Sequence, residues 1–219
     1  MIFELGMMPR IAPQQRRLQF IEFVMFEEIQ ENQLEEKHQL LWKKARSAVD
    51  VKNYEYAVSL LKPLVKELPG FLVGRKLLRA SSIQAQGGQK SKKGGLFGGL
   101  KKGGFGKKDP IQALADLEDA LEKDPFNESL NEQLYQLALS MNQLDLAAFA
   151  LETVRQSKPE KTKLLHTLAE HYLSRDMPAE AIDVFRDILK IDPTDGVAVK
   201  GEKDASARAS MKKQNWENA

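Results

Sequence analysis

The sequence contains no cysteine, which excludes disulfides, thiolate metal sites and cysteine nucleophiles. Long apolar runs are also missing, since no segment reaches the roughly 18 apolar residues of a transmembrane helix. The nearest candidate, LQFIEFVMF at 18–26, is interrupted by Glu22 and is followed by no small-residue cleavage site. We interpret this segment as the start of an amphipathic helix, and we expect a cytoplasmic protein.

Outside one segment, basic residues are fewer than acidic ones. The formal net charge is +2, but seven of the 33 basic residues lie within GGQKSKKGGLFGGLKKGGFGKK at 87–108, which also holds nine of the 14 glycines. Without these lysines, the other 26 basic residues are outnumbered by 31 acidic ones, a balance of about −5. A weakly acidic body with one basic segment is not typical of a protein that coats DNA.

The rest of the chain has an internal period of 34 residues. Four helical segments end in a proline, and 34 residues separate Pro125 from Pro159 and Pro159 from Pro193. The interval from Pro69 to Pro125 is longer, because it consists of one period plus the Gly/Lys-rich segment. An alanine lies twelve residues before each proline and a large apolar residue eight before it: Ala57 and Leu61, Ala113 and Leu117, Ala147 and Leu151, Ala181 and Phe185.

This pattern resembles the tetratricopeptide repeat (TPR) family. The resemblance is carried by NYEYAVSLLKPLVKELP, DPIQALADLEDALEKDP, NQLDLAAFALETVRQSKP and DMPAEAIDVFRDILKIDP. In such a repeat the alanine lets two helices cross closely, the residue four positions later fills the adjacent groove, and the proline ends the second helix. The resemblance implies an all-α, right-handed superhelical solenoid of helix-turn-helix repeats, with first helices at about 36–51, 72–85, 128–141 and 162–175.

We accordingly divide the chain into three parts. A partly helical N-terminal extension covers 1–35. Four TPR-like repeats follow at 36–69, 70–125, 126–159 and 160–193, and the second contains the Gly/Lys-rich insertion at 86–108 between its two helices. The remaining 194–219 predicts a C-terminal helix, in which the similarity of QNWENA to KNYEYA at 52–57 indicates the start of a truncated fifth repeat. The alternative is a solvating terminal helix.

No residue pattern supports catalysis. The histidines are His38, His166 and His171, and the last two are five apart, so they do not form an i, i+4 metal pair. The insertion contains no phosphate-binding loop, because Lys101 and Lys108 stand where G-x-x-x-x-G-K-[ST] requires glycine and serine or threonine. The abundant carboxylates follow exposed helical faces. We therefore expect a protein that is not an enzyme and has no cofactor or metal.

The remaining function is binding. In the TPR family the inner groove is lined mainly by the second, fifth, ninth, twelfth and thirteenth residues of each first helix. The resemblance implies a partner-binding groove of Trp42, Arg46, Asp50, Lys76, Gln84, Glu132, Gln136, Ser140, Lys163, His166, Glu170 and Ser174. A partner peptide or helix would bind there with Trp42 as an anchor, while ordinary solvated surface is the alternative. The asparagines with which some members bind the C-terminal carboxylate of chaperones are missing.

The insertion suggests an alternative function. Its lysines flank LFGGL and Phe105, a combination that suits RNA or acidic lipid: Lys90, Lys92, Lys93, Lys101, Lys102, Lys107 and Lys108. The glycine content predicts disorder, and a tolerated surface linker is the simpler interpretation. Self-association through the C-terminal helix is a further hypothesis. We therefore expect a protein–protein interaction scaffold with an unknown protein or peptide partner, and a peripheral tether to anionic surfaces as the alternative.

Overall fold

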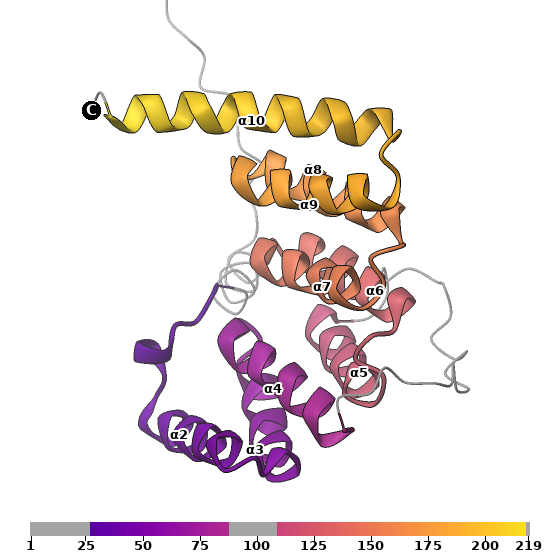
Figure 1. Ribbon diagram of the computed structural model, residues 1–219. Coiled ribbons are helices and arrows are strands. Elements are labelled where there is room, and N and C mark those ends of the chain that lie inside the picture. Colours follow the sequence, from indigo (N-terminus) through magenta and orange to yellow (C-terminus); the bar gives the residue numbers. More distant parts are fainter. Residues whose placement is uncertain (1–26, 88–108, 218–219) are drawn as a thin grey trace, which may run out of the picture.

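The computed structural model describes residues 27–87 and 109–217, and this part of the chain is a stack of helices (Figure 1). A 3-10 turn, η1 (Glu31–Gln33), precedes α2 (Glu36–Asp50), α3 (Tyr54–Glu67), α4 (Leu72–Ala85), α5 (Pro110–Lys123), α6 (Glu128–Ser140), α7 (Leu144–Ser157), α8 (Thr162–Ser174), α9 (Pro178–Ile191) and α10 (Gly196–Glu217). Within these two ranges there is no strand, and the all-α helical repeat predicted from the sequence is confirmed.

The motif residues of the 34-residue period form the core. The motif alanine is the fourth residue of α3, α5, α7 and α9, and it is at most 3% exposed in each. The large apolar residue one turn later is at most 2% exposed in all four helices. Each motif proline stands two residues beyond the end of its helix, since a proline cannot continue the helical hydrogen bonding. The recurring spacing of the TPR-like motif therefore corresponds to the residues that pack the helices together.

Three of the helix pairs are closed by three-residue turns. These turns are 51–53 between α2 and α3, 141–143 between α6 and α7, and 175–177 between α8 and α9. Their middle residues adopt the left-handed conformation, with φ of 58° at Lys52, 56° at Asn142 and 54° at Asp176. A left-handed residue after a helix ends it and reverses the chain, so the next helix packs back at once. In contrast, the connection from α4 to α5 is far longer and runs over 86–109.

Buried apolar side chains form two clusters. One cluster belongs to α2, α3 and part of α4, and it includes Trp42, Leu61 and Phe71. The other extends from α5 to α10 and also takes in Leu72, the residue directly after Phe71. Figure 1 shows α2, α3 and α4 at one end of the stack and α10 at the other. The start of α4 is therefore the point where the two apolar clusters meet.

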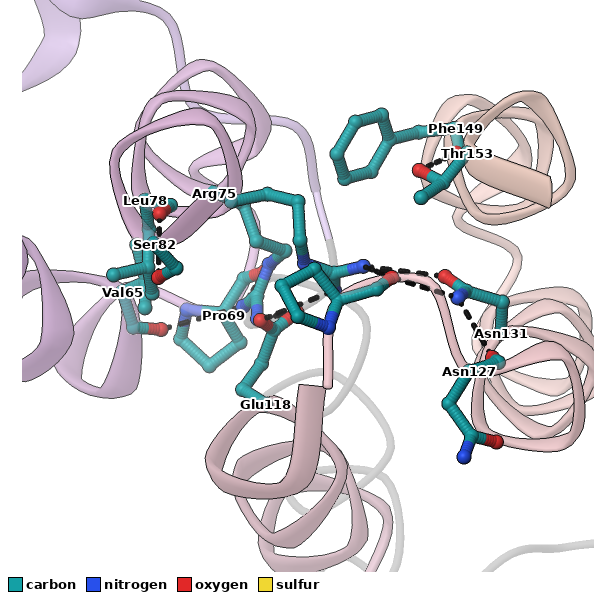
Figure 2. Close-up of polar contacts among 12 residues, drawn as sticks. Val65, Pro69, Arg75, Leu78, Ser82, Glu118, Asn127, Asn131, Phe149 and Thr153 are labelled. Atoms are coloured by element: carbon teal, nitrogen blue, oxygen red, sulfur yellow. Dashed lines mark hydrogen bonds and ion pairs between the residues drawn. The ribbon is translucent and has the colours of Figure 1, made fainter. Parts of the chain in front are cut away.

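Charged side chains fill the space between α4 and α5 (Figure 2). Arg75 and Arg79 are the fourth and eighth residues of α4, the positions at which α8 has the buried Leu165 and Ala169. Both arginines are at most 3% exposed. Glu118 of α5, which is 4% exposed, lies 3.1 Å from Nη1 of Arg75 and 3.6 Å from Nη2 of Arg79. A buried ionic contact thus replaces the apolar packing of the other pairs.

Carbonyl groups at two helix ends complete this network. Nη2 of Arg75 donates to the carbonyl oxygens of Pro69 (2.9 Å) and Val65 (3.3 Å), at the end of α3. Nη1 of Arg79 donates to the carbonyl of Pro125 (3.4 Å), after α5, and to Oδ1 of Asn131 on α6 (3.2 Å). The carboxyl end of a helix carries partial negative charge, which favours a guanidinium. Burial nevertheless lowers the pKa of Arg79 below its ordinary value.

Helix α10 is continuous over its 22 residues, from Gly196 to Glu217. It packs closely on α9, because Gly201 leaves room for the ring of Phe185, and a Cβ atom there would lie 2.3 Å from that ring. It runs without a break through KDASARASMKKQ, which contains neither glycine nor proline to end the helix, and the truncated fifth repeat stays a prediction. None of the helices described is both long and apolar enough to cross a membrane.

The left-handed turn at Lys52 predicts a stabilising substitution. Lys52→Gly should raise the free energy of unfolding by about 0.5–1 kcal/mol, because glycine adopts positive φ without a steric penalty. Lys44→Gly is the matched control, since Lys44 is an exposed residue inside α2, and it should lower stability by about 1 kcal/mol. Urea unfolding of both variants checks this. A destabilised Lys52→Gly variant would contradict the turn conformation.

The buried network predicts a destabilising substitution. Glu118→Ala removes the only carboxylate that the described network offers to Arg75 and Arg79. The free energy of unfolding should therefore fall by about 3–5 kcal/mol. Glu122→Ala, one turn later on α5, breaks only a surface ion pair with Lys62 (2.7 Å) and should cost less than about 1 kcal/mol. Chemical denaturation measures both values. Similar losses for the two variants would show that the buried pair contributes no more than a surface one.

Candidate partner-binding groove

A hollow of about 450 Å³ lies between the first helices of the first two repeats, α2 and α4. Its apolar lining comes from Trp42 and Val49 on α2 and from Val73, Leu77 and Ala80 on α4. The spacing of the three α4 residues places them along one face of that helix. Four charged residues complete the lining: Glu31, Arg46, Asp50 and Lys76. The hollow therefore combines an apolar floor with a charged rim.

Trp42 is part of the floor. Its ring is 5% exposed and packs edge-on against Phe71, with 5.1 Å between the ring centroids. The indole is largely covered and belongs to the core cluster, and its role as an anchor for a partner stays a prediction. Its Nε1 atom is buried and has no hydrogen-bond acceptor within the described part of the chain. Trp42 therefore contributes to the hollow through its apolar ring.

The rim carries both signs of charge. Nη1 of Arg46 lies 3.4 Å from a carboxylate oxygen of Glu31, and the guanidinium is 5.9 Å from the centre of the Trp42 ring. Across the hollow, Nζ of Lys76 is 5.9 Å from the centre of the Phe149 ring of α7. Exposed pairs of this kind exchange partners at little energetic cost, so the rim charges are available to a ligand.

The hollow contains four of the twelve predicted groove residues, Trp42, Arg46, Asp50 and Lys76, and none from α6 or α8. Gln84 is exposed near the end of α4. Exposed positions on the two later helices are occupied by Glu132, Gln136, Ser140, Lys163, Glu170 and Ser174. The hydroxyls of Ser140 and Ser174 donate to carbonyls of their own helices, at 2.7 Å each. A groove that spans all four repeats therefore stays a prediction.

The predicted basic segment lies outside the described residues. This applies to all seven lysines of the tether hypothesis: Lys90, Lys92, Lys93, Lys101, Lys102, Lys107 and Lys108. Its described ends are Gly87, just after α4, and Asp109, whose side chain accepts a hydrogen bond from the Ile111 amide at the start of α5. The segment thus connects the two helices between which the buried Arg75–Glu118 contact lies.

The histidines connect helices. His166 Nε2 lies 2.8 Å from a carboxylate oxygen of Asp195, which also accepts a hydrogen bond from the Ala198 amide at the start of α10. These two bonds lower the pKa of Asp195, with the amide contributing most. His171 is buried, and its Nε2–H donates to the carbonyl of Leu144 (2.9 Å). His166, a predicted groove residue, is half-buried and contacts Asp195 in the connection between α9 and α10.

Two features of this region were not predicted from the sequence. The apolar floor residues Val49, Val73 and Leu77 are half-buried, and helical spacing was the available signal for them. The buried arginines of α4 carried a weaker signal, because arginine on an amphipathic helix is ordinarily a surface residue. Arg75 and Arg79 occupy the same positions in α4 as the buried Leu165 and Ala169 do in α8, and this alignment would have identified them as buried.

Comparison with known proteins gives similarities to solved structures alone. No family model and no curated protein matches the sequence. The chain is similar to a tetratricopeptide repeat protein from Parabacteroides merdae ATCC 43184, with 17% identity, 80% of this chain and 61% of that chain covered, and a TM-score of 0.39. It thus spans less than two thirds of that protein.

Two further solved structures are similar. A thermophilic TPR protein of Thermus thermophilus has 22% identity, with 78% of this chain and 81% of that chain covered and a TM-score of 0.37. MamA from Desulfovibrio magneticus RS-1, from residue 41 to its end, has 14% identity, with 84% and 99% covered and a TM-score of 0.33. At such TM-scores these similarities carry no conclusion about partners or sites.

The environment of His171 predicts a pH dependence of stability. Burial lowers the pKa of His171 below its ordinary value of 6.5, and the nearby Arg175 lowers it further, although the bond to Leu144 opposes the shift. The folded state therefore binds fewer protons than the unfolded state, so stability is full above pH 6.5 and falls as the pH drops through the lower folded pKa.

His171→Gln should remove part of this loss, which amounts to at most about 1.4 kcal/mol per pH unit for one proton. Urea unfolding at pH 7, 6 and 5 measures the effect. Glu170→Gln, at the exposed neighbouring position, serves as control and should keep the wild-type pH dependence. The same slope in His171→Gln and wild type would mean that another group causes it.

Proposed function

We propose that this chain, a helical repeat of TPR type, is a non-enzymatic protein–protein interaction scaffold that binds a segment of a partner protein in the hollow between α2 and α4. The observation that carries the proposal is the composition of this hollow: an apolar floor and four charged residues at the rim. Such a surface is suited to an apolar side chain that arrives on a polar backbone.

The floor supplies the affinity. Burial of apolar surface is worth about 25 cal/mol per Å², so one leucine or phenylalanine side chain in the hollow contributes about 1.5–3 kcal/mol. This term favours a short segment with one or two large apolar residues.

The rim sets the specificity. Glu31 and Asp50 are acidic while Arg46 and Lys76 are basic, so the hollow has no net charge. A partner with charge of one sign would be attracted by the opposite charges of the rim and repelled by the like charges. The segment that fits best therefore carries both an acidic and a basic residue close to its apolar anchor.

The carboxyl groups with lowered pKa values lie outside the hollow. Asp119 pairs with lysine side chains of α3, and Asp187 pairs with Arg155 of α7 and with Lys190 of its own helix. The displaced pKa values thus belong to structural contacts.

Selection of random twelve-residue peptides against the full chain tests the proposal. Bound peptides should lose at least tenfold in affinity for Ala80→Trp, because Ala80 is an exposed lining residue and the indole would fill the hollow. Lys76→Glu should change the preferred charge pattern of the peptides. Fluorescence anisotropy of a labelled peptide gives the dissociation constants, and Trp42 emission in a Trp216→Phe background reports occupation of the floor.

Arg186→Glu on α9 is the control, since Arg186 is an exposed residue that pairs with Glu202 of α10 and lies outside the hollow. It should leave the affinity within a factor of two of wild type. Peptides that bind Ala80→Trp as tightly as wild type would place the binding surface elsewhere. A failure to select any peptide would contradict a peptide-binding role.

A further inference from the structure

The N-terminal part of the chain contains a strongly apolar segment, LQFIEFVMF at 18–26. Seven of its nine residues are apolar, and the exceptions are Gln19 and Glu22. The segment ends directly before Glu27, where the described part of the chain begins. Proteins seldom expose so much contiguous apolar surface to water, and an apolar patch of this kind usually marks an interaction site. We therefore expect segment 18–26 to bind an apolar surface.

The described chain begins close to the hollow between α2 and α4. The amide of Ile29 donates to the carbonyl of Gly70, in the turn between α3 and α4, at 3.0 Å. Gly70 permits this approach, because a Cβ atom there would overlap the carbonyl oxygen of Glu27. Two residues after Ile29, Glu31 lines the hollow, and so does Val73, three residues after Gly70. The N-terminal part therefore joins the described chain beside the hollow.

Segment 18–26 is long enough to cover the hollow. The lining residues of α4 extend from Val73 to Ala80, which corresponds to about 10 Å along the helix axis. Nine residues span about 13 Å as an α-helix and about 30 Å when fully extended. In either conformation the segment covers the lining of α4, and its last residue is joined directly to Glu27.

The composition of the segment matches that of the hollow. The floor is apolar and the rim has two acidic and two basic residues, so a suitable ligand has both signs of charge beside its apolar residues. Segment 18–26 contains Glu22 within its apolar run and follows directly after Arg16 and Arg17. Residues 88–108, also outside the described part, contain seven lysines and no acidic residue. Segment 18–26 is therefore the better match.

Two smaller hollows border the start of the described chain, and both suit an apolar segment less well. One has a volume of about 260 Å³, and its lining includes three acidic residues, Glu27, Glu28 and Glu35. The other has about 200 Å³, and six of its eleven lining residues are charged or carry amide side chains. The hollow between α2 and α4 is larger, at about 450 Å³, and five of its nine lining residues are apolar.

We propose that segment 18–26 of the same chain occupies the hollow between α2 and α4 and competes there with the partner segment; this rests on the function proposed above. A short connection within one chain gives a tethered segment an effective concentration in the millimolar range. A free segment with a dissociation constant of about 0.1 mM would, when tethered, occupy the hollow about 90% of the time. A partner would then bind about tenfold more weakly than to an open hollow.

Paramagnetic relaxation measured by nuclear magnetic resonance on the full chain tests this contact. The sequence has no cysteine, so a nitroxide on Gln19→Cys labels a single position. We expect the label to cause loss of the amide signals of Val73, Leu77 and Ala80. The signal of Ala207, an exposed residue of α10 at the other end of the stack, should remain.

A second measurement compares the affinity of a partner peptide. Phe20→Ser and Phe23→Ser together remove two large apolar side chains from the segment, whereas Ile2→Ser and Phe3→Ser remove two from the same terminal part outside it. A peptide whose binding is sensitive to Ala80→Trp should bind the first double variant about tenfold more tightly than wild type. The second double variant is the control, and its affinity should stay within about a factor of two of wild type.

The label also distinguishes docking in the hollow from docking elsewhere. Phe20→Ser with Phe23→Ser keeps the connection but removes the apolar side chains, so the α4 signals should return. Ala80→Trp fills the hollow and should restore the signals of Val73 and Leu77. Loss of these signals that persists in Ala80→Trp would place the segment elsewhere and overturn the proposal. Signal loss in unlabelled chains mixed with labelled ones would assign the contact to a second copy, and it would likewise contradict docking within one chain.

The two measurements separate this proposal from the proposed function. A peptide that is sensitive to Ala80→Trp but binds wild type and the Phe20→Ser/Phe23→Ser variant equally would overturn the proposal and leave the groove function intact. Retention of all three α4 signals in the labelled chain would overturn it too. A failure of every peptide to bind either form would contradict the groove function, and the label would still decide whether segment 18–26 docks.

Discussion

The contact of Glu118 with Arg75 and Arg79 is the constraint on which the rest of the arrangement depends. It lies where the apolar cluster of α2, α3 and α4 ends and that of α5 to α10 begins. A buried ion pair gains little net stability, because desolvation offsets most of the attraction. Its effect is one of geometry, since the guanidinium groups accept few alternative positions once carbonyls of α3 and α5 are bound. The network therefore fixes the position of α4.

The long connection from α4 to α5 explains why charged side chains can occupy the interface between these two helices. Elsewhere a three-residue turn with a left-handed middle residue forces the two helices of a repeat together, and apolar side chains fill the interface. The long connection between α4 and α5, 86–109, imposes no such constraint. The α4 helix instead packs on α3 and reaches α7, where Arg79 lies 5.7 Å from the centre of the Phe149 ring. The hollow between α2 and α4 borders this helix.

Sequence reasoning succeeded where the signal was periodic. Alanine and leucine at fixed distances before a proline predicted the packed helix pairs, because close helix crossing requires a small residue at a defined position. It failed where one residue type has two roles. Arg75 and Arg79 resemble the solvated arginines of any amphipathic helix, and Trp42 resembles an exposed anchor, yet all three are buried. Burial of these residues depends on which helix lies opposite, and the repeat pattern does not specify that for α4.

The fixed position of α4 has a consequence for the groove. Arg75 and Lys76 are adjacent in sequence, yet Arg75 belongs to the buried network and Lys76 lines the hollow. The helix is held on one side by the short connection 68–71 to α3 and on the other by Glu118 of α5. Because α4 is a single helix, the contacts that hold Arg75 and Arg79 also set where Val73 and Leu77 lie relative to α2.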